Sequence, residues 1–174
     1  MTSHAATATE MRDATRLGDP DTIIGVLERV GHTPSDPDLE GIVIDLLWTT
    51  STPVIRNAAA IALADMRSPT APESLVRLIR SATTKGARGT LLYALEELEA
   101  SVDLDLIVDL LINDNSEVQA EGLRSIQGGR ITYANSQDVR RETSRLRKAI
   151  TEHTDRDRIS NMREAIHLLE ALAA

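Results

Sequence analysis

The sequence Val43-Ile44-Asp45-Leu46-Leu47 returns twice further along the chain, and this repetition decides the fold. The later copies, each 32 residues after the one before, are Leu75-Val76-Arg77-Leu78-Ile79 and Ile107-Val108-Asp109-Leu110-Leu111. In every copy a charged residue interrupts an aliphatic run, as it does in a short amphipathic helix. A unit of this length that recurs along a chain is typical of solenoid proteins, in which neighbouring units stack.

A second helix is predicted after each copy, with nearly the same period. The three second helices begin near Ile55-Arg56-Asn57, Ala87-Arg88-Gly89 and Val118-Gln119-Ala120. The residues expected to cap them are Thr52, Thr84 and Asn115. Threonine and asparagine are favoured at this position because their side-chain oxygen accepts a hydrogen bond from a backbone N–H that the helix leaves unpaired. The repeating unit is therefore helix, turn, helix.

The remaining segments extend this register in both directions. We assign residues 5–31 to a loosely matching leading helix pair, 38–127 to the core repeats, 128–136 to an insertion loop and 137–174 to a C-terminal helix pair. One helix pair cannot bury its apolar face alone, so we expect the pairs to share a continuous core. All 174 residues would then form a single domain.

The second helix of the first core repeat, Val54-Ile55-Arg56-Asn57-Ala58-Ala59-Ala60-Ile61-Ala62-Leu63, resembles the second helix of HEAT repeats. Its small residues allow helices to approach closely. The resemblance implies an all-α fold, a right-handed α-solenoid of about five HEAT-like helix pairs.

Composition supports an aliphatic, helical core. Aromatic residues make up 2% of the chain, with no Phe, whereas 41% of the residues are hydrophobic. Sandwiches and barrels draw on aromatic and β-branched residues in short alternating strands, and no such segment is found. The chain has no Cys, which excludes disulfides, thiolate zinc sites and Cys nucleophiles. Asp105 and Asp109 interrupt the most apolar stretch, so we expect no membrane span and a cytoplasmic protein.

No pattern in the sequence indicates catalysis. The four histidines lie apart, and Arg residues interleave with the one cluster that suggests a cation site, His153, Asp155 and Asp157. Gly128-Gly129 lacks the Lys-Ser/Thr that completes a phosphate-binding loop. We therefore predict no catalytic residue, no cofactor and no metal, and a protein that is not an enzyme.

Charge is distributed unevenly along the chain. The net charge is −8, and between Arg88 and Arg124 nine acidic residues face only those two arginines. Between Arg130 and Arg163 nine basic residues face five acidic ones. An acidic surface opposes binding of nucleic acid and favours a basic protein partner. The basic run from Arg140 to Lys148 is expected to pair with its acidic neighbour.

One face of the middle repeat is the candidate binding surface. Ala87, Leu91, Ala94, Leu95 and Leu98 form an apolar stripe, which leaves other residues of this helix on a different face. The predicted partner-binding residues, on the second helices that line the concave side of HEAT proteins, are Tyr93, Glu96, Glu97, Glu117, Glu121 and Arg124. Tyrosine is frequent at binding hot spots. The alternative interpretations are a tyrosine packed between repeats and ordinary solvated glutamates.

A narrower resemblance covers about residues 86 to 127. Arg88-Gly89-Thr90-Leu91-Leu92-Tyr93-Ala94-Leu95-Glu96-Glu97-Leu98, with Leu106 to Leu111 and Asn115 to Val118 after it, is similar to the HEAT-like immunity proteins encoded beside bacterial polymorphic toxins, including contact-dependent inhibition systems. This resemblance implies a cytoplasmic inhibitor that binds a cognate toxin, typically a nuclease with a basic surface, and blocks it by occlusion. The free protein is expected to be a monomer.

Other functions remain open at this point. A general HEAT-repeat scaffold or adaptor for protein–protein interaction is the main alternative. HEAT-like phycobiliprotein lyases and DNA glycosylases are remote alternatives. The glycosylases need a basic groove, which the acidic middle repeat contradicts.

Overall fold

The computed structural model describes residues 7–33 and 36–172, and within them the chain is helical apart from turns and two very short strands. Residues 5–6 and 173–174 of the predicted terminal pairs lie outside the described residues. The chain groups into two compact units, Met1–Ile79 and Arg80–Ala174. The all-α prediction is confirmed, while the continuous right-handed solenoid and the single domain remain predictions.

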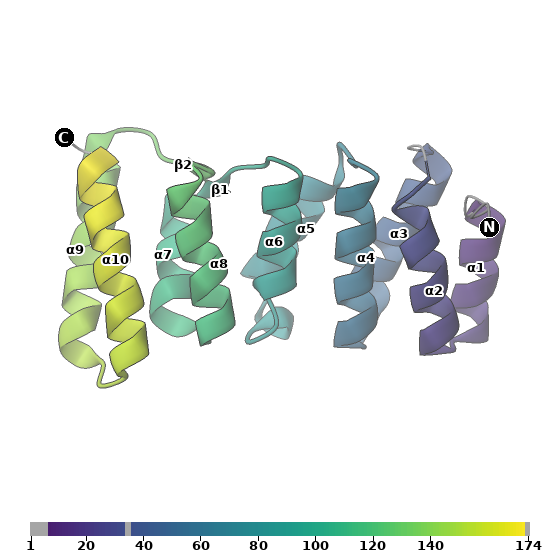
Figure 1. Ribbon diagram of the computed structural model, residues 1–174, viewed down its shortest axis with the longest axis horizontal. Helices are drawn as coiled ribbons and strands as arrows, with labels where there is room; N and C mark the ends of the chain where they lie inside the picture. Colours follow the sequence, from purple (N-terminus) through teal and green to yellow (C-terminus); the bar gives the residue numbers. More distant parts are fainter. Residues whose placement is uncertain (1–6, 34–35, 173–174) are drawn as a thin grey trace. The chain divides into compact units, whose positions relative to one another are not determined.

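The N-terminal unit holds two stacked helix pairs and most of a further helix. Its elements are α1 (Ala8–Leu17), α2 (Pro20–Val30), α3 (Pro37–Thr49), α4 (Pro53–Asp65) and all but the last residue of α5 (Ala71–Arg80). Helix α1 packs on α2 and α3 packs on α4, while α1 also contacts α3 and α2 contacts α4 (Figure 1). First helices thus pack on first helices, and second helices on second helices.

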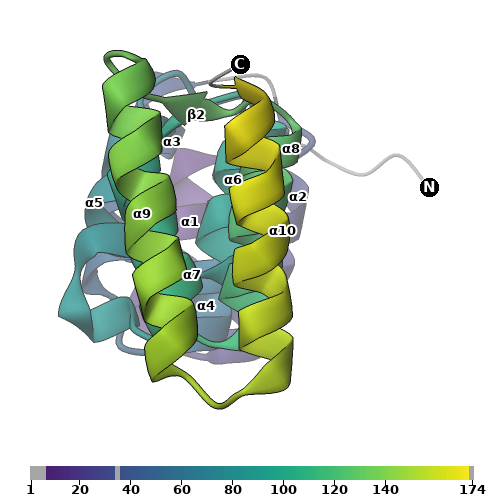
Figure 2. The same cartoon turned by 90° about the vertical axis from the view of Figure 1, so that its left-hand side faces the viewer.

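The C-terminal unit repeats this packing. Its elements are the 3-10 turn η1 (Ala82–Thr84), α6 (Gly89–Glu97), β1 (Val102–Asp103), α7 (Leu104–Asn113), α8 (Ser116–Gln127), β2 (Ile131–Thr132), α9 (Ser136–Glu152) and α10 (Arg156–Leu172). Helix α8 contacts α6, α7 and α10, and α7 contacts α9. Figure 2 shows α9 and α10 side by side and joined at one end, as the predicted C-terminal pair requires.

The insertion predicted at residues 128–136 contributes a strand that the sequence pattern did not indicate. Strands β1 and β2 pair in parallel, with Val102 opposite Ile131 and Asp103 opposite Thr132. Val102 and Ile131 are buried, so the pairing adds two aliphatic side chains to the core. The ladder closes the chain around the helix pair α7–α8.

The three predicted N-caps have three different outcomes. Asn115 caps α8 by accepting a hydrogen bond from the backbone N–H of Val118 at 3.0 Å. Thr52 occupies the cap position of α4, but its side chain makes no capping bond. The prediction for Thr84 was wrong: α6 starts only at Gly89, and the buried Thr84 ends the 3-10 turn. Gly86, with φ +80°, lengthens this connection, because few other residues adopt that conformation.

One hydrogen bond recurs at equivalent positions of the three core repeats. In each, a side chain near the start of the second helix donates to the first carbonyl after the first helix. The bonds are Arg56 to Thr50 at 2.9 Å, Arg88 to Ser81 at 2.8 Å and Gln119 to Asp114 at 3.1 Å. Helix ends leave carbonyls without partners, so this donor satisfies one of them and fixes the turn. The three donors follow one another at 32 and then 31 residues, which is the period of the sequence repeat.

A buried carboxylate joins α3 to the turn before α5. Glu40 is only 6% exposed, and its Oε1 accepts hydrogen bonds from the hydroxyls of Ser68 and Thr70 and from the Thr70 backbone N–H. Burial by itself raises the pKa of Glu40, but the bonds from Ser68 and Thr70 outweigh it and bring the pKa below its ordinary value of 4.5. Folding therefore favours the charged form.

We expect Glu40→Gln to lower the free energy of unfolding at neutral pH by about 1 kcal/mol, because a neutral acceptor makes weaker hydrogen bonds. Since the folded state lowers the pKa, the contribution of Glu40 is present above the ordinary value and is lost as pH falls through the folded value. Denaturation followed by circular dichroism measures the free energy of unfolding at neutral and at acidic pH. Between these two conditions, Glu40→Gln should lose less of this free energy than the parent. Asp45→Asn, on an exposed position of the same helix, is the control, and equal pH dependence of Glu40→Gln and the parent would contradict this role.

Candidate protein-binding site

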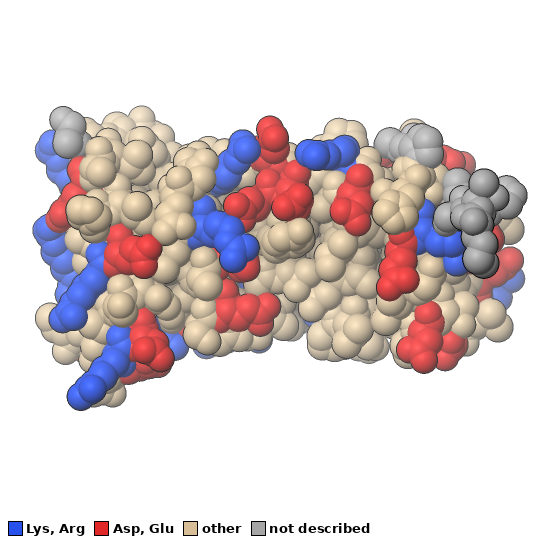
Figure 3. Space-filling view, in the orientation of Figure 1, with Lys and Arg blue, Asp and Glu red and all other residues tan. Residues whose placement is uncertain are grey.

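The six predicted partner-binding residues lie on two helices that pack against each other. Tyr93, Glu96 and Glu97 belong to α6, and Glu117, Glu121 and Arg124 belong to α8. We call these residues the α6–α8 face. In the orientation of Figure 1, acidic side chains gather over α6 and α8 with basic atoms beside them (Figure 3).

The two helices are held in register by the turns that precede them. Asp114, whose side chain is fully buried, accepts hydrogen bonds from the Arg88 guanidinium at 2.7 Å and from the Gly86 backbone N–H at 3.1 Å. In return, the Asn115 side-chain amide donates to the Gly86 carbonyl at 2.8 Å. A buried ion pair with further hydrogen bonds fixes geometry closely, since an unpaired charge there is costly. The start of α6 is thereby tied to the start of α8.

This register places glutamates of the two helices together. The Glu117 side chain lies directly against the Gly89 backbone, so closely that a Cβ added at Gly89 would come within 2.5 Å of the Glu117 carboxylate oxygen. The absence of a side chain at Gly89 lets Glu117 lie over the first residue of α6. Carboxylates are favoured near a helix N-terminus because the backbone dipole is positive there.

Glu121 is partly buried. Its side chain is 14% exposed and accepts a hydrogen bond from Arg124 at 3.0 Å. Burial raises the pKa of Glu121; the Arg124 charge opposes this, and the charges of Glu96 and Glu117 raise the pKa further, so the net direction is upward. Glu96 of α6 and Glu117 of α8 therefore both repel the Glu121 carboxylate, and Arg124 is the cation that opposes them.

Tyr93 and Glu97 lie on α6 near this cluster and are exposed. Tyr93 is 39% exposed. This exposure disagrees with the alternative interpretation, in which the tyrosine is packed between repeats. Glu97 is also exposed. The structure thus brings Glu96, Glu117, Glu121 and Arg124 together and presents Tyr93 and Glu97 to solvent, while the concave shape of this face remains a prediction.

Most other carboxylates of the acidic segment are paired with arginines. Those pairs are Glu99 with Arg130, Asp103 and Asp105 with Arg80, Asp109 with Arg145, and Asp114 with Arg88. The predicted pairing of the basic run with its acidic neighbour is therefore confirmed at Arg145. Among the described residues, no Lys or Arg lies within ion-pair distance of Glu96 or Glu117. The acidic excess is thus concentrated on the α6–α8 face.

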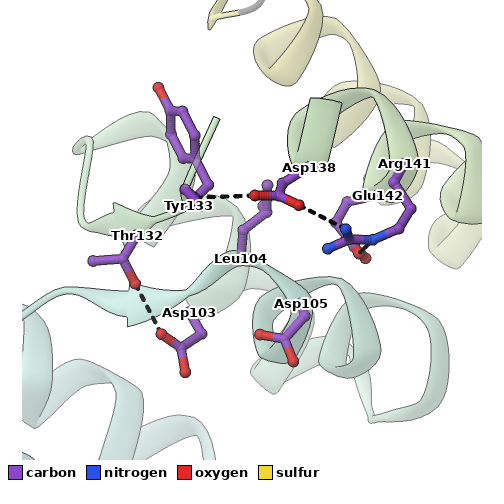
Figure 4. Close-up of a pocket in the computed structure, with 9 residues that line it drawn as sticks. Asp103, Leu104, Asp105, Thr132, Tyr133, Asp138, Arg141 and Glu142 are labelled. Carbon is purple, nitrogen blue, oxygen red and sulfur yellow. Dashed lines mark hydrogen bonds and ion pairs between the residues drawn. The ribbon is translucent and has the colours of Figure 1, made fainter. Parts of the chain in front are cut away.

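A pocket of about 290 Å³ lies beside the strand pair and the start of α9 (Figure 4). Its carboxylates are bonded within the chain: Asp103 accepts from Thr132 at 2.9 Å, and Asp138 accepts from the Arg141 guanidinium at 2.6 Å and the Ala134 N–H at 3.1 Å. The buried Glu142 pairs with both Arg141 and Arg145. The Tyr133 ring extends away from these carboxylates (Figure 4). These contacts attach α9 to the insertion.

Sequence reasoning missed the residues that position this face. Asp114 was counted only as one charge of the acidic segment, and Arg88 was noted for its repeat position, its charge and its place in the motif, with no pairing predicted between them. The available signal was positional, since Asp114 directly precedes the N-cap of α8 and Arg88 is in register with Arg56. An acidic residue at the end of one helix and an arginine at the start of another are candidates for a buried ion pair.

Neither a metal cluster nor a membrane span is found within residues 7–33 and 36–172. No group of three or more His, Asp or Glu side chains there is arranged to hold a metal ion. No helix in the same ranges is both long and apolar enough to cross a bilayer.

Comparison of the chain with protein-family models, with curated proteins and with solved structures found no match.

We expect Glu121→Gln to stabilise the free protein at neutral pH, by no more than about 1 kcal/mol because the Arg124 pair is lost as well. Folding raises the pKa of Glu121, so its favourable contribution is complete below the ordinary value of 4.5 and is lost as pH rises through the folded value. The gain should therefore appear at neutral pH and vanish in acid. Urea denaturation at several pH values measures it, with Glu152→Gln, which removes an exposed ion pair with Lys148, as control. A destabilised Glu121→Gln at neutral pH would contradict repulsion within the cluster.

Proposed function

We propose that this protein is an immunity protein that binds a basic toxin domain, of the nuclease type, and neutralises it by occlusion through the α6–α8 face. The carrying observation is the cluster of Glu96, Glu117 and Glu121: burial and the charges of Glu96 and Glu117 raise the pKa of Glu121, and the Arg124 charge opposes this without reversing it. Repulsion of this kind opposes the folded state of the free protein. A cationic partner relieves it, so the interaction is stronger than solvated single charges provide.

Exposed Tyr93 supplies an apolar ring with a hydrogen-bonding hydroxyl on the same helix as Glu96. Binding energy at interfaces concentrates in such aromatic residues, and surrounding charges chiefly increase the association rate and select the partner. The combination fits a protein partner with a basic surface around an accessible pocket or cleft.

The similarity of residues 86 to 127 to HEAT-like immunity proteins supports the same proposal from a different feature. It rests on the order of side chains along α6, α7 and the start of α8, whereas the charge argument rests on the positions of the glutamates in space. The adaptor function remains the alternative, and it predicts no protection against a toxin.

The decisive experiment is co-expression with the toxin domain encoded immediately upstream, scored by host survival and by co-purification of the pair. We expect survival and a one-to-one complex. The Glu96→Lys/Glu117→Lys variant should lose protection and bind at least about 100-fold more weakly, because a charge reversal opposes a basic partner. The matched control is Asp45→Lys/Glu152→Lys, which changes the net charge equally at exposed positions elsewhere and should still protect.

Toxicity undiminished by the well-expressed parent protein would reject the immunity function and return the protein to the adaptor class. Protection that survives Glu96→Lys/Glu117→Lys would retain the function but move the interface away from the α6–α8 face.

The Tyr93→Ala variant separates the contribution of the aromatic ring from that of the charges. We expect it to weaken the complex about 10- to 100-fold through faster dissociation, as at interface hot spots.

Binding should also be coupled to a proton. In the free protein, burial and the neighbouring glutamates raise the pKa of Glu121. A cation that the partner places beside Glu121 lowers this pKa. Affinity is therefore expected to rise with pH through the range in which free Glu121 titrates, with release of a proton. Calorimetry in buffers of different ionisation enthalpy measures this release, which should disappear in Glu121→Gln; its persistence there would assign the proton to another group.

A further inference from the structure

A groove of about 560 Å³ runs between α2 and α4 in the N-terminal unit. Ile24 and Leu27 of α2 form one wall, and α4 contributes a stripe of aliphatic and small side chains. Val54 is 61% exposed and Ile61 is 39% exposed, although both are aliphatic. Large exposed apolar side chains gathered in a groove commonly mark an interaction surface.

The groove, which His32 also lines, has hydrogen-bond acceptors on Asn57, Glu28 and Asp65. The Asn57 side-chain oxygen is buried and has no hydrogen-bond partner among the described residues. Glu28 and Asp65 also line the groove, and both are exposed. No Lys or Arg of the described residues lies within ion-pair distance of either carboxylate. A buried acceptor left unpaired costs free energy, so the chain alone does not satisfy the polar groups at this position.

The stripe on α4 has the spacing of one helix face. Val54, Ala58, Ile61 and Asp65 follow one another at steps of four, three and four residues. With a rise of 1.5 Å per residue, the stripe is about 16 Å long. The side chains of a second helix, laid along it, would fit between its ridges, as in other grooves that bind amphipathic helices.

We propose that the α2–α4 groove binds an amphipathic, basic helix of a protein partner. Aliphatic side chains of that helix cover Val54 and Ile61, and its Lys or Arg residues pair with Glu28 and Asp65. The same two carboxylates repel phosphate groups, which argues against a nucleic acid or an anionic membrane as the occupant. This site lies on different helices from the α6–α8 face and does not depend on the function proposed for that face.

The test uses three synthetic helical peptides of about 18 residues, five turns of helix. The first has Leu on one face and Lys on the other; the second replaces Lys by Glu, and the third replaces Leu by Ser. Each is titrated into the full-length protein carrying labelled isoleucine methyl groups. We expect the Leu/Lys peptide alone to shift the Ile24 and Ile61 resonances in a saturable manner.

Variants separate this groove from general attraction to an acidic protein. Glu28→Lys/Asp65→Lys should weaken binding of the Leu/Lys peptide at the groove by at least about tenfold, because two favourable charge pairs become repulsive. The control Asp45→Lys/Glu73→Lys makes the same change in net charge, and Glu96→Lys/Glu117→Lys removes charge from the other face. Both should leave the Ile24 and Ile61 shifts intact.

Three results would overturn the proposal. In the first, the Leu/Lys peptide leaves both isoleucine resonances unmoved at saturating concentration. In the second, the Ser or Glu peptide shifts them equally. In the third, the resonances shift with protein concentration alone and light scattering shows a dimer, which would assign the groove to self-association.

Discussion

Each core repeat depends on one hydrogen bond that closes its inter-helix turn. The donor is the side chain at the second-helix position occupied by Arg56, Arg88 or Gln119, and the acceptor is the first carbonyl beyond the preceding helix. A terminal carbonyl that lacks such a partner loses a hydrogen bond when it is shielded from water. The bond therefore fixes the angle at which the second helix leaves the turn, and with it the residues that helix presents to its neighbours.

The α6–α8 face follows from this constraint by one further step. Arg88 closes its own turn and also reaches Asp114, so the geometry of one repeat is transmitted to the next. With both turns fixed, Glu117 meets the bare backbone of Gly89, and Glu96 lies near enough to Glu121 to affect its ionisation. Electrostatic strain in the cluster is sustained by packing elsewhere, which is common where binding residues are held ready for a partner.

The sequence predicted the elements better than the contacts between them. Helix positions followed from aliphatic periodicity, and the structure has helices α1 and α2 within the predicted leading pair and α9 and α10 at the predicted C-terminal pair. Thr84 failed as a cap because Gly86 lengthens the turn after it, and periodicity does not report turn length. The two-residue strand pair escaped detection because alternation needs a longer segment to be visible.

The candidate face was found from charge density, which is a property of composition. Its internal arrangement was not predictable, because which carboxylates find an arginine depends on contacts between residues far apart in the chain. Asp109 and Arg145 are 36 residues apart and still pair. The groove between α2 and α4 was missed for a related reason: the sequence pattern placed Val54 and Ile61 on one helix, and only packing among the described residues shows that both stay exposed.

The parallel ladder between β1 and β2 has a consequence for how the C-terminal unit opens. Val102 donates to the Arg130 carbonyl, so the chain entering α7 is bonded to the chain leaving α8. Helices α7 and α8 therefore lie in a loop that is closed at its base, and the start of α7 and the end of α8 are held together by the ladder. We expect the backbone amides at these two helix ends to exchange hydrogen with solvent in one shared opening, because fraying of either end breaks the same ladder.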